Sequence, residues 1–142
     1  MEEALVLAEA AGKLGNVPVG AVAVMDGRVI ARSSNLRETL QDPTAHAEIL
    51  VLREAARVLG TWRLEELTLV VTLEPCAMCA GAIAHALVKR LIYGAPEPRS
   101  GAVDSNLQVL RGRGTEVHGR VLEQRCSEMM SRFFEDLRLR TE

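Results

Sequence analysis

Long apolar runs, cysteine-rich segments, internal repeats and low-complexity stretches are all missing from this chain of 142 residues. No run reaches the 18 apolar residues that predict a membrane-spanning helix, and no basic segment followed by an apolar leader opens the chain. We therefore expect no membrane span and no secretion. Three cysteines are too few for a disulfide framework, which favours a reducing cytoplasm as the location.

A strong excess of charge of one sign is also missing, because 17 Lys and Arg face 19 Asp and Glu, for a net charge of −2. This balance gives no overall indication of a nucleic-acid partner. Residues 1–86 carry 7 basic and 11 acidic residues, a net of −4, and residues 87–142 carry 10 and 8, a net of +2. The basic lean of the second part would suit contact with phosphates, although solvated helix faces explain it equally well.

The composition, with 48% hydrophobic and 25% charged residues, fits one globular domain that spans residues 1–142. Apolar periodicity predicts strands at residues 19–25, 28–34, 67–71, 90–94 and 115–118. It predicts helices at residues 1–14, 47–59, 76–88, 103–110 and 121–138, and a polar loop at 35–41. The strand–helix–strand order in the middle of the chain indicates parallel pairing, so we expect an α/β fold with a mixed five-stranded sheet and helices on both faces.

Two thiols three residues apart, Cys76 and Cys79, follow Pro75 at the start of the predicted helix 76–88. This spacing places both sulfurs on one face of the first turn, where unpaired N–H groups and the helix dipole favour thiolates. Two neighbouring thiolates repel each other unless a cation lies between them. A soft divalent metal ion, above all zinc, is therefore the expected occupant.

Cys-x-x-Cys alone also fits a redox dithiol or a structural zinc knuckle. A redox pair would more often lie in a Trp-Cys-Gly-Pro-Cys turn, which is absent here. A structural zinc site needs four protein ligands, and no second close cysteine pair exists. We interpret the remaining thiol, Cys126 in the last predicted helix, as a small buried apolar residue.

The missing ligand is predicted at His46, which we place in the first turn of the helix that continues through residues 47–59, and Glu48 follows two residues later. One imidazole and two thiolates make three protein ligands and leave a fourth position for water, the pattern of a catalytic zinc site. Glu48 needs no bond to the metal and can accept a proton from that water. His-x-Glu followed by Pro-Cys-x-x-Cys is the signature of zinc-dependent nucleobase deaminases.

From about Leu5 to Leu137 the chain resembles the bacterial tRNA-specific adenosine deaminases, which convert the wobble adenosine of an anticodon to inosine. The resemblance is carried by the segments 17–21, 42–48, 72–82, 93–95 and 133–134, together with Asn35. It implies a three-layer α/β/α fold of the cytidine-deaminase type and a homodimer that binds a tRNA anticodon stem-loop with both subunits.

The resemblance also implies roles for single residues. His46, Cys76 and Cys79 would bind one Zn2+ per subunit, and Glu48 would be the proton shuttle. Asn35 would hydrogen-bond the flipped base, and the base pocket would be lined by Val17 and Pro18. Read from the residues alone, Asn35 also fits a turn and Val17-Pro18 also fits packing.

Two other functions stay open. A free-base or nucleotide deaminase, of the guanine or cytosine type, shares the Asp-Pro-Thr-Ala-His-Ala-Glu segment. Guanine deaminases, however, usually read Cys-Glu-Pro-Cys-Pro-Met-Cys, where this chain has Leu73 and Ala77. A non-catalytic zinc-stabilised module is the other alternative, but such a module would have no use for Glu48.

Overall fold

The computed structural model describes residues 1–142 and is built around one five-stranded sheet. The strand order is β2-β1-β3-β4-β5. β1 pairs antiparallel with β2 and β3, whereas β4 pairs parallel with β3 and β5. The bounds are β1 Gly20–Met25, β2 Arg28–Ser34, β3 Thr68–Leu73, β4 Arg90–Ala95 and β5 Glu116–His118. The predicted mixed sheet and the parallel pairing of its third and fourth strands are confirmed.

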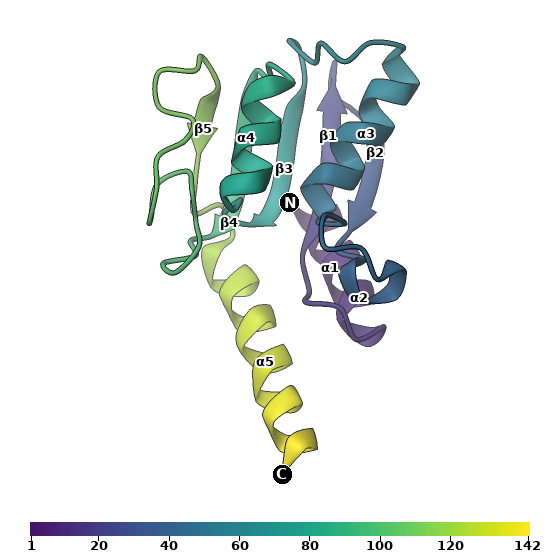
Figure 1. The fold of residues 1–142 in the computed structure, drawn as a ribbon, viewed down its shortest axis with the longest axis vertical. Coiled ribbons are helices and arrows are strands. Elements are labelled where there is room, and N and C mark those ends of the chain that lie inside the picture. The colour runs from purple at the N-terminus through teal and green to yellow at the C-terminus, as the bar shows by residue number, and fades with distance from the viewer.

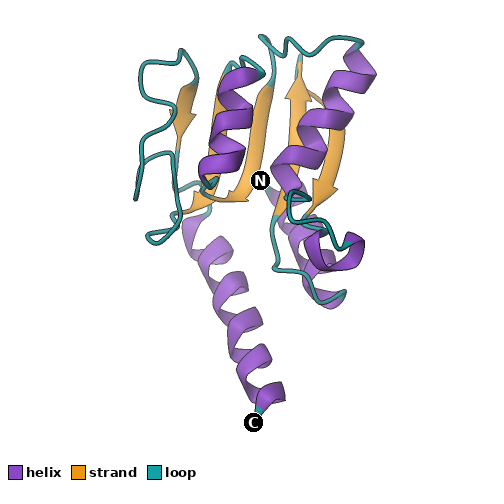
Figure 2. Ribbon diagram, viewed as in Figure 1, coloured by secondary structure: helices purple, strands orange, loops and turns teal.

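Helices cover both faces of the sheet and complete three layers (Figure 1). On one face α3, Ala47–Leu59, lies beside α4, Ala77–His85. On the other face α1, Glu2–Lys13, packs against β1, while α5, Glu123–Thr141, contacts β4 and α1 and then extends past the sheet to the C-terminus (Figure 2). None of these helices combines the length and the apolar character that crossing a bilayer requires.

The main core lies between the sheet and the pair α3 and α4. It contains 20 buried residues, among them Val51 of α3, Ile83 of α4, and Leu69 and Leu91 of the central strands. Full burial of an aliphatic side chain of this size stabilises the fold by roughly 1.5–3 kcal/mol. Because both helices share this core, their N-terminal ends are held in fixed positions at the same edge of the sheet.

Two predicted segments were wrong. Residues 103–110, predicted as a helix, form successive turns without helical structure. The predicted loop 35–41 contains a short helix, α2, Arg37–Leu40. The cause lies far away in the sequence, because the fully buried side chain of Asn16 accepts hydrogen bonds from the N–H groups of Glu38 and Thr39, at 3.0 and 3.1 Å. These bonds satisfy two backbone donors at the start of α2, and the nearby amide oxygen of Asn35 satisfies a third, the N–H of Arg37.

The turns between β4 and β5 are organised by one buried carboxylate, Glu74, which is only 2% exposed. It accepts hydrogen bonds from the backbone N–H groups of Glu97, Val103, Asp104 and Ser105, at 2.9 to 3.2 Å, and from the Ser105 hydroxyl. Burial by itself raises the pKa of Glu74, but these hydrogen bonds outweigh it and hold the pKa below its usual value. The ionised carboxylate therefore fixes the backbone of residues 97 and 103–105 in the turns that are observed in place of the predicted helix.

We predict that Glu74→Gln lowers the free energy of unfolding at pH 7 by roughly 2–3 kcal/mol, because an amide presents one acceptor oxygen instead of two charged ones. Since the folded-state pKa lies below the unfolded value of about 4.3, the stabilisation is present above pH 4.3 and is lost as the pH falls through the folded pKa. Wild type should lose this contribution on acidification and the variant should not.

Urea unfolding at pH 7 and below pH 4 measures both effects. Glu135→Gln is the matched control, because Glu135 is exposed and pairs with no cation. Equal unfolding free energies for wild type and Glu74→Gln at pH 7 would contradict the assigned role.

Candidate active site

The N-terminal ends of α3 and α4 bring the predicted ligands to the same place. His46 immediately precedes α3 and Cys76 immediately precedes α4, both with extended backbone, and Cys79 lies in the first turn of α4. The sequence interpretation had placed His46 and Cys76 inside the first helical turns, so each lies one step earlier than expected. In this position the side chains point past the helix ends toward each other.

The distances within this group fit a tetrahedral metal site. His46 Nδ1 lies 3.7 Å from Cys76 Sγ and 3.4 Å from Cys79 Sγ, and the three ligand atoms all lie within 4.8 Å of one another. A tetrahedral zinc ion with ordinary bond lengths separates a nitrogen and a sulfur ligand by about 3.6 Å. The three residues can therefore hold a metal ion, and no other His, Cys, Asp or Glu belongs to the group.

The pKa values of the two thiols shift in opposite directions. The hydrogen bond from Cys79 holds the pKa of Cys76 far below its usual range, with further help from His46. The same hydrogen bond, together with burial, raises the pKa of Cys79. The hydrogen bond to Cys76 in turn raises the pKa of His46. Both sulfurs can be ionised together only when a cation shares the site, which is the behaviour expected of metal ligands.

Glu48 lies in the first turn of α3, two residues after His46, and is 4% exposed. Burial raises the pKa of its carboxyl group, which means that the protonated form is accessible closer to neutral pH than for an ordinary glutamate. Glu48 is not a member of the ligand group. A buried carboxyl group that can change its protonation state beside a metal site is suited to general acid–base chemistry.

A cavity of about 130 Å³ opens beside these residues. Its walls come from the link before β1, the start of α2, the ends of α3 and β3, and the β4–β5 loop. The lining residues are Val17, Val19, Asn35, Arg37, His46, Ala47, Glu48, Leu73, Glu74, Cys76 and Ser100. This volume is well below the 300–1,000 Å³ that is typical of sites for drug-sized molecules. It suits a single flat ring system and leaves no room for an attached sugar and phosphate.

Asn35 and Val17, which the resemblance places beside the flipped nucleobase, both line this cavity. The Asn35 amide donates to the carbonyl oxygen of Val17 and accepts from the N–H of Arg37, each at 3.1 Å. A primary amide has two hydrogens and two lone pairs, so one of each remains for a ligand. The turn role and the base-binding role of Asn35 are therefore compatible.

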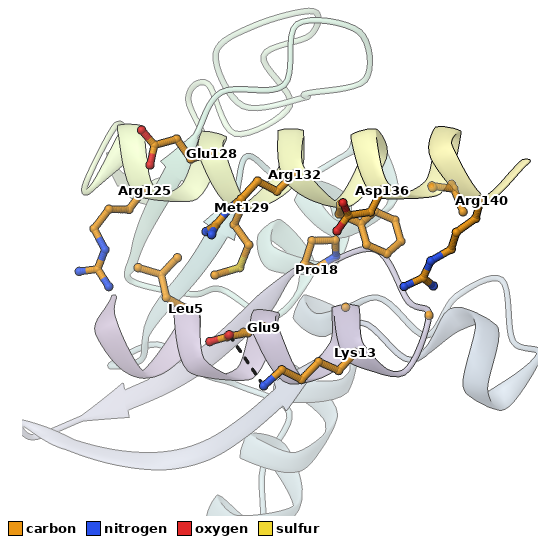
Figure 3. A pocket seen from close by; sticks show the side chains of 14 residues that line it. Leu5, Glu9, Lys13, Pro18, Arg125, Glu128, Met129, Arg132, Asp136 and Arg140 are labelled. Atoms are coloured by element: carbon orange, nitrogen blue, oxygen red, sulfur yellow. Dashed lines mark ion pairs between the residues drawn. The ribbon is translucent and has the colours of Figure 1, made fainter. Parts of the chain in front are cut away.

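Pro18 does not line the cavity. It lines a separate groove of about 530 Å³ between α1 and α5, together with Phe133 and Met129 (Figure 3). The N–H of Val19 donates to the carbonyl oxygen of Val17 at 2.9 Å, so the chain turns at Pro18, and Val17 and Val19 line the cavity while Pro18 lines the groove.

Sequence reasoning missed Arg37, Glu74 and Ser100 as lining residues. Glu74 lies inside the quoted cysteine motif, so its position offered a signal. Ser100 offered none, because it belongs to the β4–β5 loop, which Glu74 fastens to the end of β3. The same loop pairs with the residues before α4, where the N–H of Ala102 donates to the carbonyl oxygen of Pro75 at 2.8 Å.

Comparison with known proteins agrees with this geometry. Residues 1–138 match the model of the MafB19-like deaminase family. The chain is 48% identical to the tRNA-specific adenosine deaminase of Bacillus subtilis, over 97% of this chain and 88% of that protein. It is also 48% identical to the tRNA-specific adenosine deaminase of Agrobacterium fabrum, over 98% of this chain and 94% of that one.

The fold matches a structure solved in a study of A-to-I editing by tRNA:A34 deaminases at the wobble position of transfer RNA. The TM-score is 0.87 and the identity is 48%, over 91% of this chain and 96% of that one. The three-layer fold of the cytidine-deaminase type, expected from the resemblance, is thereby confirmed. The chain belongs to the MafB19-like deaminase family and to the tRNA-specific adenosine deaminases.

Proposed function

We propose that this protein converts adenosine to inosine at the wobble position of a tRNA anticodon, as one zinc-dependent hydrolytic domain spanning residues 1–142. The observation that carries the proposal is the convergence of His46, Cys76 and Cys79 beside the buried Glu48, at a cavity sized for one base. Membership of the tRNA-specific adenosine deaminases supports the choice of substrate.

Zinc is the proposed metal because two sulfurs and one imidazole nitrogen form a donor set that this ion prefers. When bound by three protein ligands, zinc supplies Lewis acidity that allows a water molecule to lose a proton near neutral pH. His46, Cys76 and Cys79 would hold it.

Glu48 is the proposed proton carrier. In the first step its carboxylate accepts a proton from the attacking water, whose oxygen bonds to C6 of adenine. Glu48 then delivers this proton to the ring nitrogen beside C6. It next takes the remaining proton from the added oxygen and passes it to the amino group, so the C6–N bond breaks, ammonia leaves and the oxygen becomes the carbonyl of inosine. Burial supports this role, because it raises the pKa of Glu48 and keeps the proton from exchanging with bulk water between the steps.

The shape of the cavity supports a base that is turned out of its stack. About 130 Å³ admits the base alone, with Asn35 offering polar contacts and Val17 an apolar wall. Unpaired loop bases are already partly unstacked in RNA, so their extrusion costs less than extrusion from a duplex. An anticodon loop therefore suits this site.

We also propose that the protein acts as a homodimer in the cytoplasm. A mostly apolar hollow of about 320 Å³ lies over α3, α4 and the segment that follows α3, beside Trp62, which is 61% exposed. Exposed apolar surface of this kind is typical of contacts between proteins. The three free cysteines suit a reducing compartment, where tRNA is also found.

The substrate assignment predicts inosine formation when the zinc-loaded protein is incubated with an arginine-tRNA anticodon stem-loop, and no product with free guanine, cytosine or adenosine. Nucleoside analysis of the RNA and release of ammonia measure the two reactions. Ammonia from free bases alone would favour the free-base deaminase. If folded and zinc-loaded protein forms neither inosine nor ammonia with any substrate, the non-catalytic zinc module would be favoured.

We predict that Glu48→Gln keeps its zinc and lowers turnover by at least 10²- to 10⁴-fold, because an amide cannot carry the proton. Metal analysis and single-turnover kinetics measure the two quantities. Glu54→Gln, a change on the same helix at a half-buried glutamate that pairs with Arg57 away from the ligand group, should leave both unchanged. Loss of zinc from Glu48→Gln would mean that this carboxylate is a ligand and not a proton carrier.

Cys79→Ala should lose its bound zinc and melt at a lower temperature than wild type, because metal binding contributes to the stability of the folded state. A chelator should lower the melting temperature of wild type and leave that of Cys79→Ala unchanged. Cys126→Ala is the control, since Cys126 is buried away from the ligand group and should keep the chelator response. An equal chelator response in wild type and Cys79→Ala would rule out Cys79 as a ligand.

A further inference from the structure

Arg37, the first residue of α2, is the only lysine or arginine that lines the catalytic cavity. Its side chain is exposed, so it lies at the mouth and not at the bottom. No carboxylate lies within 4.0 Å of its guanidinium group, whereas eight other lysine and arginine residues form ion pairs. The full charge of Arg37 is therefore available to a ligand.

The backbone that carries Arg37 is held by two buried asparagines. The Asn35 amide oxygen accepts a hydrogen bond from the Arg37 N–H at 3.1 Å. The Asn16 amide oxygen accepts from the next two N–H groups of α2, and its nitrogen donates to the Thr39 hydroxyl at 2.8 Å. Asn16 is 0% exposed and Asn35 is 7% exposed, so water competes little for these bonds. The mouth of the cavity thus presents a cation on a preorganised support.

The size of the cavity determines which part of a bound nucleotide lies beside the Arg37 guanidinium group. Because about 130 Å³ admits only a base, the sugar and the adjoining phosphates of a bound nucleotide must remain at the mouth. A guanidinium group offers planar paired donors that match phosphate oxygens and keeps its charge at every physiological pH. A free base brings no phosphate and gains nothing from this residue.

We propose that Arg37 binds a phosphate beside the nucleotide whose base enters the cavity, and that this contact makes the site select a polynucleotide over a free base. The inference rests on the proposed function and adds to it the residue that senses the RNA backbone. The contact acts on binding, because the phosphate lies outside the reacting atoms.

The test removes the charge from each partner separately. Deamination is measured with the anticodon stem-loop carrying either its natural phosphates or a neutral methylphosphonate on the 5′ or the 3′ side of the target adenosine. Arg37→Gln should raise KM about tenfold with natural RNA and leave kcat within about twofold. One of the two neutral linkages should raise the KM of wild type by a similar factor. It should not raise the KM of Arg37→Gln any further, because the linkage and the substitution remove the same contact.

Salt dependence gives a second measurement. The slope of log KM against log salt concentration should fall by about 0.7 in Arg37→Gln, the value expected for one phosphate contact on a single strand. Arg28→Gln is the matched control: Arg28 is exposed, forms no ion pair and lies at the far end of β2. This variant should keep the wild-type KM and slope.

Several results would overturn the contact. These are an unchanged KM and slope in Arg37→Gln, fully additive losses, or neutral linkages without effect on wild type. The last of these needs no variant and therefore decides even if Arg37→Gln folds poorly. Wild type that fails to deaminate the stem-loop would overturn the proposed function, and this inference with it. Active wild type with any of the former results would overturn the Arg37 contact alone.

Discussion

The meeting of one imidazole with two sulfurs is the constraint on which the rest of the site depends. His46 lies 30 and 33 residues before the two cysteines, and the two helices that follow these ligands share one hydrophobic core. That core brings the ends of α3 and α4 within a few ångströms of each other at one edge of the sheet. The extended residues that precede α3 and α4 direct the imidazole and the sulfurs toward each other. The distances between the ligand atoms therefore depend on the aliphatic core that α3 and α4 share.

A second carboxylate has a structural task that complements the chemical task of Glu48. Both Glu48 and Glu74 are nearly fully buried and both line the cavity, yet their pKa values shift in opposite directions. Burial dominates for Glu48 and raises the pKa, whereas the backbone donors around Glu74 outweigh burial and lower it. One carboxyl group is therefore able to exchange a proton, and the other is held ionised as an anchor for the loop that carries Ser100.

Much of the fold and of the site could be predicted from sequence because the signals are local. The helix 47–59 was predicted at its observed bounds, since apolar periodicity and the left-handed Gly60 mark it within one segment. His46, Cys76 and Cys79 were recognisable because metal ligands need particular residue types at particular spacings. Arg37 and Ser100 were not, because their places depend on contacts of Asn16 and Glu74 with distant backbone.

Pro18 shows that neighbours in the sequence need not line the same cavity. Val17 lines the cavity beside the ligand group and Pro18 lines the groove between α1 and α5, because the chain turns between Val17 and Val19. Residues 103–110 have a helical pattern of apolar residues but form turns. The buried Glu74 carboxylate accepts hydrogen bonds from the N–H groups of residues 103–105.

The division of the ligands between two helices also links the metal site to the outer surface. His46 and Glu48 lie at the start of α3, and Cys76 and Cys79 lie at the start of α4. The apolar hollow near Trp62 is formed by the flanks of these same two helices. If metal binding changes the spacing of α3 and α4, it also changes the hollow between their flanks. Linkage then requires that a partner bound at the hollow change the affinity for the ion by the same free energy.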